Sequence, residues 1–161
     1  MTKKVLLWIE DNPSRSHREL IQSTVIKRGL ALEIVKGVSS LQRILENFSK
    51  TEDVIIHGVI LDLMIHGADS LADFGYPEVS WNSPADVGEY LLQYVFRNIQ
   101  PKQQALAQLQ LHEKPILILT VKSETREEDF LVHGKSIELA HKYDLSGVDL
   151  DKQIRDWINK I

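Results

Sequence analysis

The sequence predicts an α/β fold, in which a doubly wound sheet of five parallel strands carries helices on both faces. The main observation is that short apolar runs alternate with longer amphipathic runs along the chain. A length of 161 residues, with 43% hydrophobic residues, also suits one domain with a single buried core. We therefore expect residues 1–161 to form one domain.

Five segments carry the apolar pattern of strands, and the last of them is the weakest. They are Lys4–Ile9, Ala31–Val35, Val54–Leu61, Pro115–Thr120 and Ser136–Lys142. Amphipathic segments between and after them predict the helices. These are Arg15–Lys27, a helix that begins near Ser39, Ser83–Ile99, a further piece within Gln100–Leu111, a short acidic helix over Glu124–Val132, and Leu150–Ile161.

The segment from Met64 to Pro84 shows neither the apolar pattern of a strand nor the amphipathic pattern of a helix. It is rich in Gly, Asp, Ser and Pro, so the sequence predicts a long loop. The loop also carries Phe74, Tyr76 and Trp81. These aromatic side chains either pin the loop against the domain or form a lid or docking surface for a partner.

Composition excludes several classes of protein. The chain has no Cys, which excludes disulfides, Cys-ligated zinc, iron–sulfur clusters and a thiol nucleophile. A net charge of −4 without a Lys/Arg cluster argues against a nucleic-acid partner. The apolar runs are too short to span a membrane, and the start of the chain lacks the pattern of a signal peptide. We expect a cytoplasmic protein with no membrane partner.

Polar residues stand where the predicted strands end. Glu10 and Asp11 follow the first strand, Asp62 follows the third, Thr120 ends the fourth and Lys142 ends the fifth. Ligands of doubly wound sheets bind outside the carboxyl ends of the strands. Three crowded carboxylates repel one another unless a hard divalent cation lies among them, which predicts a Mg²⁺ site. A carboxylate, a hydroxyl and an ammonium group beside that cation would suit a phosphoryl group, with the nearest carboxylate as nucleophile.

Three segments together resemble the receiver domain of two-component response regulators. They are Lys4–Asn12 (KVLLWIEDN), Val59–Met64 (VILDLM) and Pro115–Thr120 (PILILT). The resemblance covers essentially the whole chain. It implies a flavodoxin-like sheet with strand order 2-1-3-4-5.

The resemblance also implies a chemical role for each site residue. Asp62 would accept a phosphoryl group from a histidine kinase or a phosphotransfer protein. Asp11 and Asp62 would bind Mg²⁺ directly, Glu10 would bind it through water, and the backbone carbonyl of Met64 would complete the protein ligands. Mg²⁺ is the expected cofactor.

Thr120 would be the switch hydroxyl and Lys142 the lysine that pairs with the phosphoryl group. The chain departs from the family pattern near both residues. Tyr143 stands where a proline usually follows the lysine, so the cis peptide bond of the family is not implied for this chain. Leu139 replaces the usual aromatic switch residue, and His66 replaces the proline that usually follows the acceptor.

The remaining departure is an insertion after the third strand. Thr120 follows Asp62 by 58 positions (120 − 62), far more than in a typical receiver domain. We place the inserted loop at about residues 68–83.

The predicted function is therefore a receiver domain that switches a protein-interaction surface when Asp62 is phosphorylated. Such a protein is not a conventional enzyme, because it at most catalyses its own phosphotransfer and dephosphorylation. Its loops after the fourth strand, including Val121–Arg126, would shift toward a downstream protein target. The sequence does not determine whether the domain forms a homodimer.

Two alternatives come from other classes. A phosphatase of the haloacid-dehalogenase type needs a second acid two residues after the first, where this chain has Met64. A pseudo-receiver, which keeps the fold as a phosphorylation-independent interaction module, is the stronger alternative. It is favoured by Tyr143, Leu139 and the insertion.

Overall fold

The computed structural model describes residues 1–122, 124–134, 136–143 and 149–161. Its centre is a sheet of five parallel strands in the order β2-β1-β3-β6-β7. The strands are β1 (Lys3–Ile9), β2 (Ala31–Val35), β3 (Val54–Leu61), β6 (Ile116–Thr120) and β7 (Ile137–His141). These are the five predicted strands in the order 2-1-3-4-5, so the predicted fold class is confirmed.

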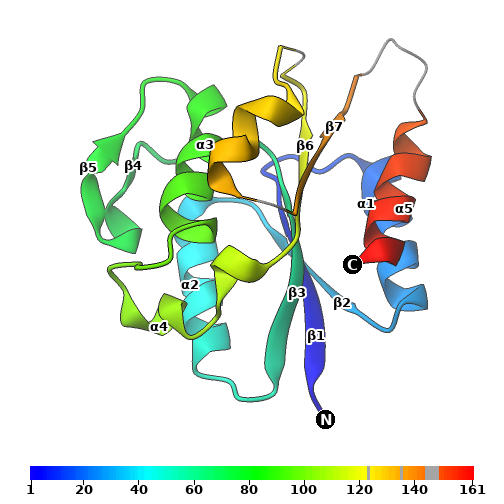
Figure 1. Cartoon of the computed structure of the whole chain (residues 1–161), viewed down its shortest axis with the longest axis horizontal. Helices are drawn as coiled ribbons and strands as arrows, with labels where there is room; N and C mark the ends of the chain where they lie inside the picture. Colours follow the sequence, from blue (N-terminus) through cyan, green and yellow to red (C-terminus); the bar gives the residue numbers. More distant parts are fainter. Residues whose placement is uncertain (123, 135, 144–148) are drawn as a thin grey trace.

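Helices cover both faces of this sheet (Figure 1). One face is covered by α1 (Arg15–Lys27) and α5 (Leu150–Lys160). The other face is covered by α2 (Val38–Ser49), α3 (Val87–Leu91), the π-helical turn η3 (Leu92–Phe96) and α4 (Gln104–Ala107). The strands between the two helical layers are therefore shielded from solvent on both sides.

Strand β1 shows why this layering follows from the sequence. Side chains alternate between the two faces of a strand. Val5, Leu7 and Ile9 pack in the core beneath α2 and α3, whereas Leu6 and Trp8 pack beneath α1 and α5. A run of five apolar residues is what a strand needs when both of its faces are buried.

The segment predicted as a long loop contains regular structure. Strands β4 (Ser70–Leu71) and β5 (Tyr76–Ser80) pair antiparallel, and the 3-10 helix η1 (Ala72–Phe74) lies between them. These elements lie outside α3, away from the central sheet (Figure 1). The prediction of a long loop from Met64 to Pro84 was wrong over residues 70–80, because the Gly and Pro residues within and beside such short strands hide their pattern.

Aromatic contacts attach this segment to the helix that follows it. The indole N–H of Trp81 donates a hydrogen bond to the Ala68 carbonyl at 2.8 Å. The Trp81 ring stacks on Tyr90, with the ring centroids 5.8 Å apart. Phe74 is fully buried in the core. The interpretation that the aromatic residues pin the segment against the domain is supported by these contacts.

Helices in the second half of the chain are shorter than predicted. The predicted helix over Ser83–Ile99 is divided into the 3-10 turn η2 (Pro84–Asp86), α3 and η3. The predicted piece over Gln100–Leu111 is helical only in α4. The predicted acidic helix over Glu124–Val132 is instead the 3-10 helix η5 (Glu127–His133). Periodicity identified the apolar face of these helices. It did not show where the backbone hydrogen-bonding pattern changes between 3-10, α and π.

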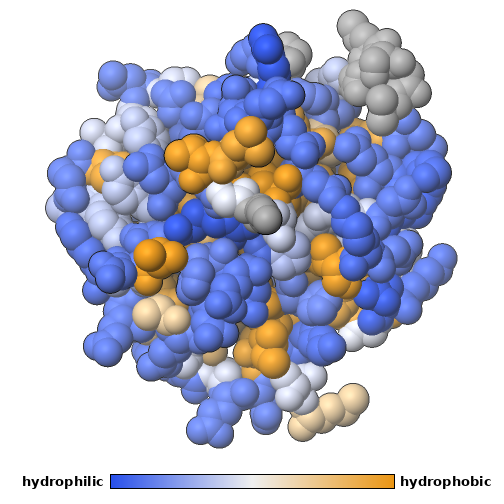
Figure 2. All heavy atoms as spheres, in the orientation of Figure 1, coloured by the Kyte–Doolittle hydropathy of each residue, from blue (hydrophilic) through white to orange (hydrophobic). Residues whose placement is uncertain are grey.

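The visible surface is largely hydrophilic. On the face shown in Figure 2, hydrophobic residues form small separate patches between hydrophilic ones. Leu131 and Val132 of η5 contribute exposed apolar side chains. Within the described part of the chain, no helix combines the length and the hydropathy that crossing a membrane requires.

Candidate functional site

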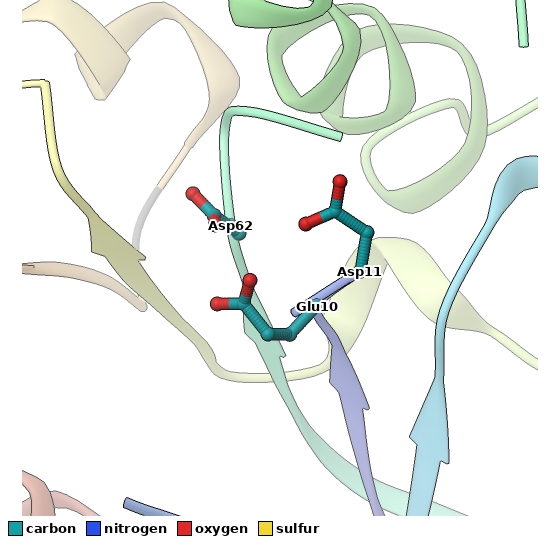
Figure 3. Close-up of side chains that lie close together, drawn as sticks. All are labelled: Glu10, Asp11 and Asp62. Carbon is teal, nitrogen blue, oxygen red and sulfur yellow. The ribbon is translucent and has the colours of Figure 1, made fainter. Parts of the chain in front are cut away.

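Three carboxylates meet at the carboxyl ends of two neighbouring strands. Glu10 and Asp11 follow β1, and Asp62 follows β3. Since Ile9 and Leu61 pair across these strands, the residues after them emerge side by side. One carboxylate oxygen from each residue lies within 4.8 Å of the others. Figure 3 shows the three side chains pointing toward a common space.

The carboxylates open into a cavity of about 390 Å³. Residues from the ends of β1, β3, β6 and β7 and from the start of α1 form its wall. They are Glu10, Asp11, Asn12, Ser14, His17, Asp62, Met64, His66, Val121, Lys142 and Tyr143. The cavity is therefore at the edge of the sheet where ligands of doubly wound folds bind.

Lys142 supplies a positive charge among the carboxylates. Its Nζ donates a hydrogen bond to Asp62 Oδ2 at 2.8 Å and a second one to Glu10 Oε2. Burial by itself would lower the pKa of Lys142, but the hydrogen bonds and charges of Asp62 and Glu10 outweigh burial and raise it. The ammonium group stays charged and compensates part of the negative charge.

Glu10 is the most perturbed acid of the cluster. Burial and the negative charge of Asp62 raise its pKa from 4.5 to about 7, although Lys142 acts in the opposite direction. Its Oε1 also accepts a hydrogen bond from the backbone N–H of Asn12 at 3.3 Å. The charge of Lys142 alone is therefore not enough to keep Glu10 fully ionised at neutral pH. A further cation would favour the ionised form.

Asp11 has a different partner. Its Oδ2 accepts the backbone N–H of His66 at 2.9 Å and lies 2.7 Å from Nδ1 of the same residue. Burial would raise the pKa of Asp11, but these hydrogen bonds and the charge of His66 outweigh it and lower the pKa. Asp11 is consequently an ionised carboxylate at neutral pH.

The loop after β3 fixes the orientation of Asp62. The backbone N–H of Met64 donates to Asp62 Oδ1 at 3.1 Å, while Lys142 occupies Oδ2. The N–H of Gly88, in α3, donates to the Leu63 carbonyl at 3.0 Å and so holds the same loop from outside. Both oxygens of a nearly fully buried carboxylate therefore have a donor.

Thr120 is separate from the group that forms the cavity wall. It is fully buried at the end of β6, and its Oγ1 accepts the backbone N–H of Lys122 at 3.2 Å. The Lys122 side chain continues this connection: its Nζ lies 3.2 Å from the Ala85 carbonyl and 3.3 Å from Glu89 Oε1. Ser123, within the loop expected to shift, is outside the described residues.

The sequence-based site is thus brought together except for one member. Glu10, Asp11, Asp62 and Lys142 converge, and Met64 lies in the cavity wall. The sequence put His66 in the loop after the proposed acceptor but gave no sign of its hydrogen bonds to Asp11. Sequence reasoning also missed four wall residues that follow no recognisable spacing in the sequence: Asn12, Ser14, His17 and Tyr143.

Two departures from the receiver pattern can be located. Leu139 is in the middle of β7, and its side chain packs in the core on the same face as α2 and α3. Tyr143 is largely exposed, with its side chain at the cavity rim. Among the described residues every peptide bond is trans.

Comparison with known proteins rests on structure. No family model and no curated protein matches the chain. The Mn²⁺-bound form of response regulator Rcp1 matches with a TM-score of 0.57 at 19% identity, covering 98% of this chain and 96% of that one. A response regulator receiver domain from Rhodospirillum rubrum matches with a TM-score of 0.50 at 20% identity, covering 96% and 90%. The chain has the fold of response regulator receiver domains.

Proposed function

We propose that the protein is a phospho-accepting receiver domain of two-component signal transduction, with Asp62 as the acceptor. One observation carries this proposal. In a sheet with the receiver fold, Asp62 and Lys142 are hydrogen-bonded beside two further acids at the strand ends, inside an open cavity. A buried carboxylate facing a cavity, with its charge balanced by a lysine, is typical of a nucleophilic site.

The donor set suits Mg²⁺. Carboxylate oxygens are the ligands that this ion prefers, and three of them lie within 4.8 Å of one another. Asp11 and Asp62 would hold the ion directly, Glu10 through water, and Met64 through its backbone carbonyl. When bound, Mg²⁺ would neutralise charge on the phosphoryl oxygens. The Mn²⁺ in the Rcp1 structure supports a divalent cation here.

The residues of this chain supply the nucleophile and its orientation. A carboxylate oxygen of Asp62 would form a bond to phosphorus while the bond from phosphorus to the donor nitrogen or oxygen breaks. The Met64 N–H holds the other oxygen, so that the carboxylate keeps one orientation. Lys142 would then transfer its hydrogen bond from Asp62 to the phosphoryl oxygens, and Thr120 would donate to them after leaving the Lys122 amide. Water attack on the aspartyl phosphate would release phosphate.

A histidine kinase or a phosphotransfer protein would be the donor, and a downstream protein would bind the altered surface. The extra charge would shift the loop after β6 between two arrangements. We propose a cytoplasmic location and one receiver domain in which about residues 68–83 are inserted. Such a switch requires only that phosphorylation shift an existing equilibrium between the two arrangements of this loop.

The pseudo-receiver remains the second candidate, and Thr120 is the observation that favours it. The Thr120 hydroxyl is held by the Lys122 amide, outside the cavity wall. A domain that never carries phosphate has no need to move it. The protein would then act as a phosphorylation-independent interaction module.

Intact mass measurement after incubation with acetyl phosphate and Mg²⁺ separates the two functions. The wild-type protein should gain one phosphoryl group, and Asp62→Asn should gain none. Circular dichroism of the variant checks that it is folded. A wild-type protein that stays unmodified, or a variant labelled as strongly as wild type, would refute the acceptor assignment.

A further inference from the structure

The geometry points to His66 as a positioning residue that orients Asp11 for binding of the divalent cation. This inference rests on the proposed function, because it assigns a role around the proposed metal site. His66 does not belong to the set of residues implied by the receiver resemblance. Where this chain has His66, that pattern has a proline, which has no N–H to donate.

Two donors of His66 converge on one oxygen of Asp11. The backbone N–H lies 2.9 Å and the ring Nδ1 2.7 Å from Asp11 Oδ2. The two residues are 55 positions apart and leave different strands, β1 and β3. The contact therefore ties together the two loops that carry the carboxylate cluster.

The two side chains differ in exposure. The Asp11 side chain is 18% exposed, whereas that of His66, which also belongs to the cavity wall, is 63% exposed. With Oδ2 occupied by two donors, the carboxylate cannot rotate freely, and Oδ1 remains as the oxygen offered to a cation. Fixing the rotamer before binding removes part of the entropy cost of ordering the ligand.

Partners that orient a metal ligand typically change metal affinity by about 10- to 100-fold when removed. An opposing effect also has to be considered, because a charged imidazole close to the site would repel a cation. The two effects predict opposite signs for the removal of His66. The sign of the change in affinity therefore tests the inference.

Four variants dissect the two hydrogen bonds. His66→Asn keeps a side-chain N–H donor close to the position of Nδ1 and keeps the backbone N–H. His66→Ala removes the ring donor alone, and His66→Pro removes both donors. His112→Ala is the matched control, since His112 lies outside the cavity wall and its ring nitrogen Nε2 is 3.7 Å from Glu113 Oε1.

Mg²⁺ affinity, measured by calorimetric titration of the full chain, is the readout. We expect His66→Ala to bind about 10-fold more weakly than wild type, His66→Pro more weakly still, His66→Asn within about 3-fold and His112→Ala unchanged. Thermal melting shows whether each variant is folded. Rescue by Asn would separate orientation of Asp11 from simple packing.

Equal or tighter Mg²⁺ binding by a folded His66→Ala would overturn the role of His66 while leaving the receiver proposal intact. Failure of the wild-type protein to bind Mg²⁺ at millimolar concentration would overturn the metal site and this role together. Labelling of Asp62 by acetyl phosphate, measured separately, distinguishes these two failures.

Discussion

Gly88 packs directly against the backbone of Asp62. A Cβ atom at Gly88 would stand 2.4 Å from the Asp62 carbonyl oxygen and 2.4 Å from Leu63 Cα, closer than real Cβ atoms approach other atoms. The Gly88 N–H also donates to the Leu63 carbonyl. The start of α3 is therefore seated on the loop that carries the proposed acceptor, and only glycine allows this approach.

Gly88→Ala should displace that loop. We expect a loss of about 1–3 kcal/mol in the free energy of unfolding, because the methyl group meets backbone that cannot move aside cheaply. Phosphorylation by acetyl phosphate should slow as Asp62 leaves its position. Urea denaturation and intact mass measure the two effects. Gly37→Ala is the control, since its Cβ would meet only Ser40 Oγ at 3.6 Å; equal losses in both variants would contradict this account.

Lys142→Met should destabilise the protein when no divalent cation is present. The substitution leaves Glu10 and Asp62, both nearly fully buried, without their shared cation. Removing one partner of a buried ion pair costs about 3–5 kcal/mol, and we expect a loss near the lower end because Lys142 is 12% exposed. Urea denaturation in EDTA measures it. The exposed Lys36→Met serves as control. A loss no larger than that of the control would exclude the ion pair as a stabilising contact.

Stability without metal should fall as pH rises from about 4.5 to 7, the interval between the ordinary pKa of Glu10 and its pKa in the folded protein. The pKa of Glu10 is about 7 in the folded protein against an ordinary 4.5, so the folded state binds a proton that the unfolded state has released. This contribution is complete below the lower pKa and is lost as pH rises through the higher one. The raised pKa of Lys142 acts only above its ordinary 10.5, outside this range. Burial lowers the pKa values of His17 and His133, which offsets part of the fall near pH 6.

The expected slope is at most about 1.4 kcal/mol per pH unit. Urea denaturation at several pH values in EDTA measures it, and Glu10→Gln should flatten the curve. Added Mg²⁺ should stabilise the protein more at pH 8 than at pH 6, because proton and metal compete for the same carboxylate. A curve for Glu10→Gln as steep as that of wild type would assign the effect to another group.

Trp81→Ala should release the inserted segment without removing the acceptor site. The substitution deletes the hydrogen bond to the Ala68 carbonyl and the stacking on Tyr90. We expect a loss of about 2 kcal/mol and new protease cleavage within residues 68–83, with phosphorylation retained. Limited proteolysis with and without Mg²⁺ is the measurement, and the exposed Ile99→Ala is the control. Cleavage of the wild-type segment that is blocked by Mg²⁺ and a phosphoryl mimic would instead favour a lid.

The sheet could be predicted because its determinants are local. Val5 to Ile9 is apolar at every position, and a strand buried on both faces needs this pattern wherever it lies in the sheet. The acidic site followed from the same reasoning, since residues after parallel strands emerge at one edge. Glu10, Asp62 and Lys142 could therefore be grouped before any contact was known.

The contacts that the sequence did not predict lie in the connections between strands. No periodicity relates His66 to Asp11, Gly88 to Asp62 or Lys122 to Glu89, because each contact depends on the path of two loops. The same reason hid β4 and β5 within a segment rich in turn residues. Local sequence patterns were sufficient to predict the layers and the strand ends that carry charge. Long-range packing determined which donors reach those charges, because loop paths respond to the whole core.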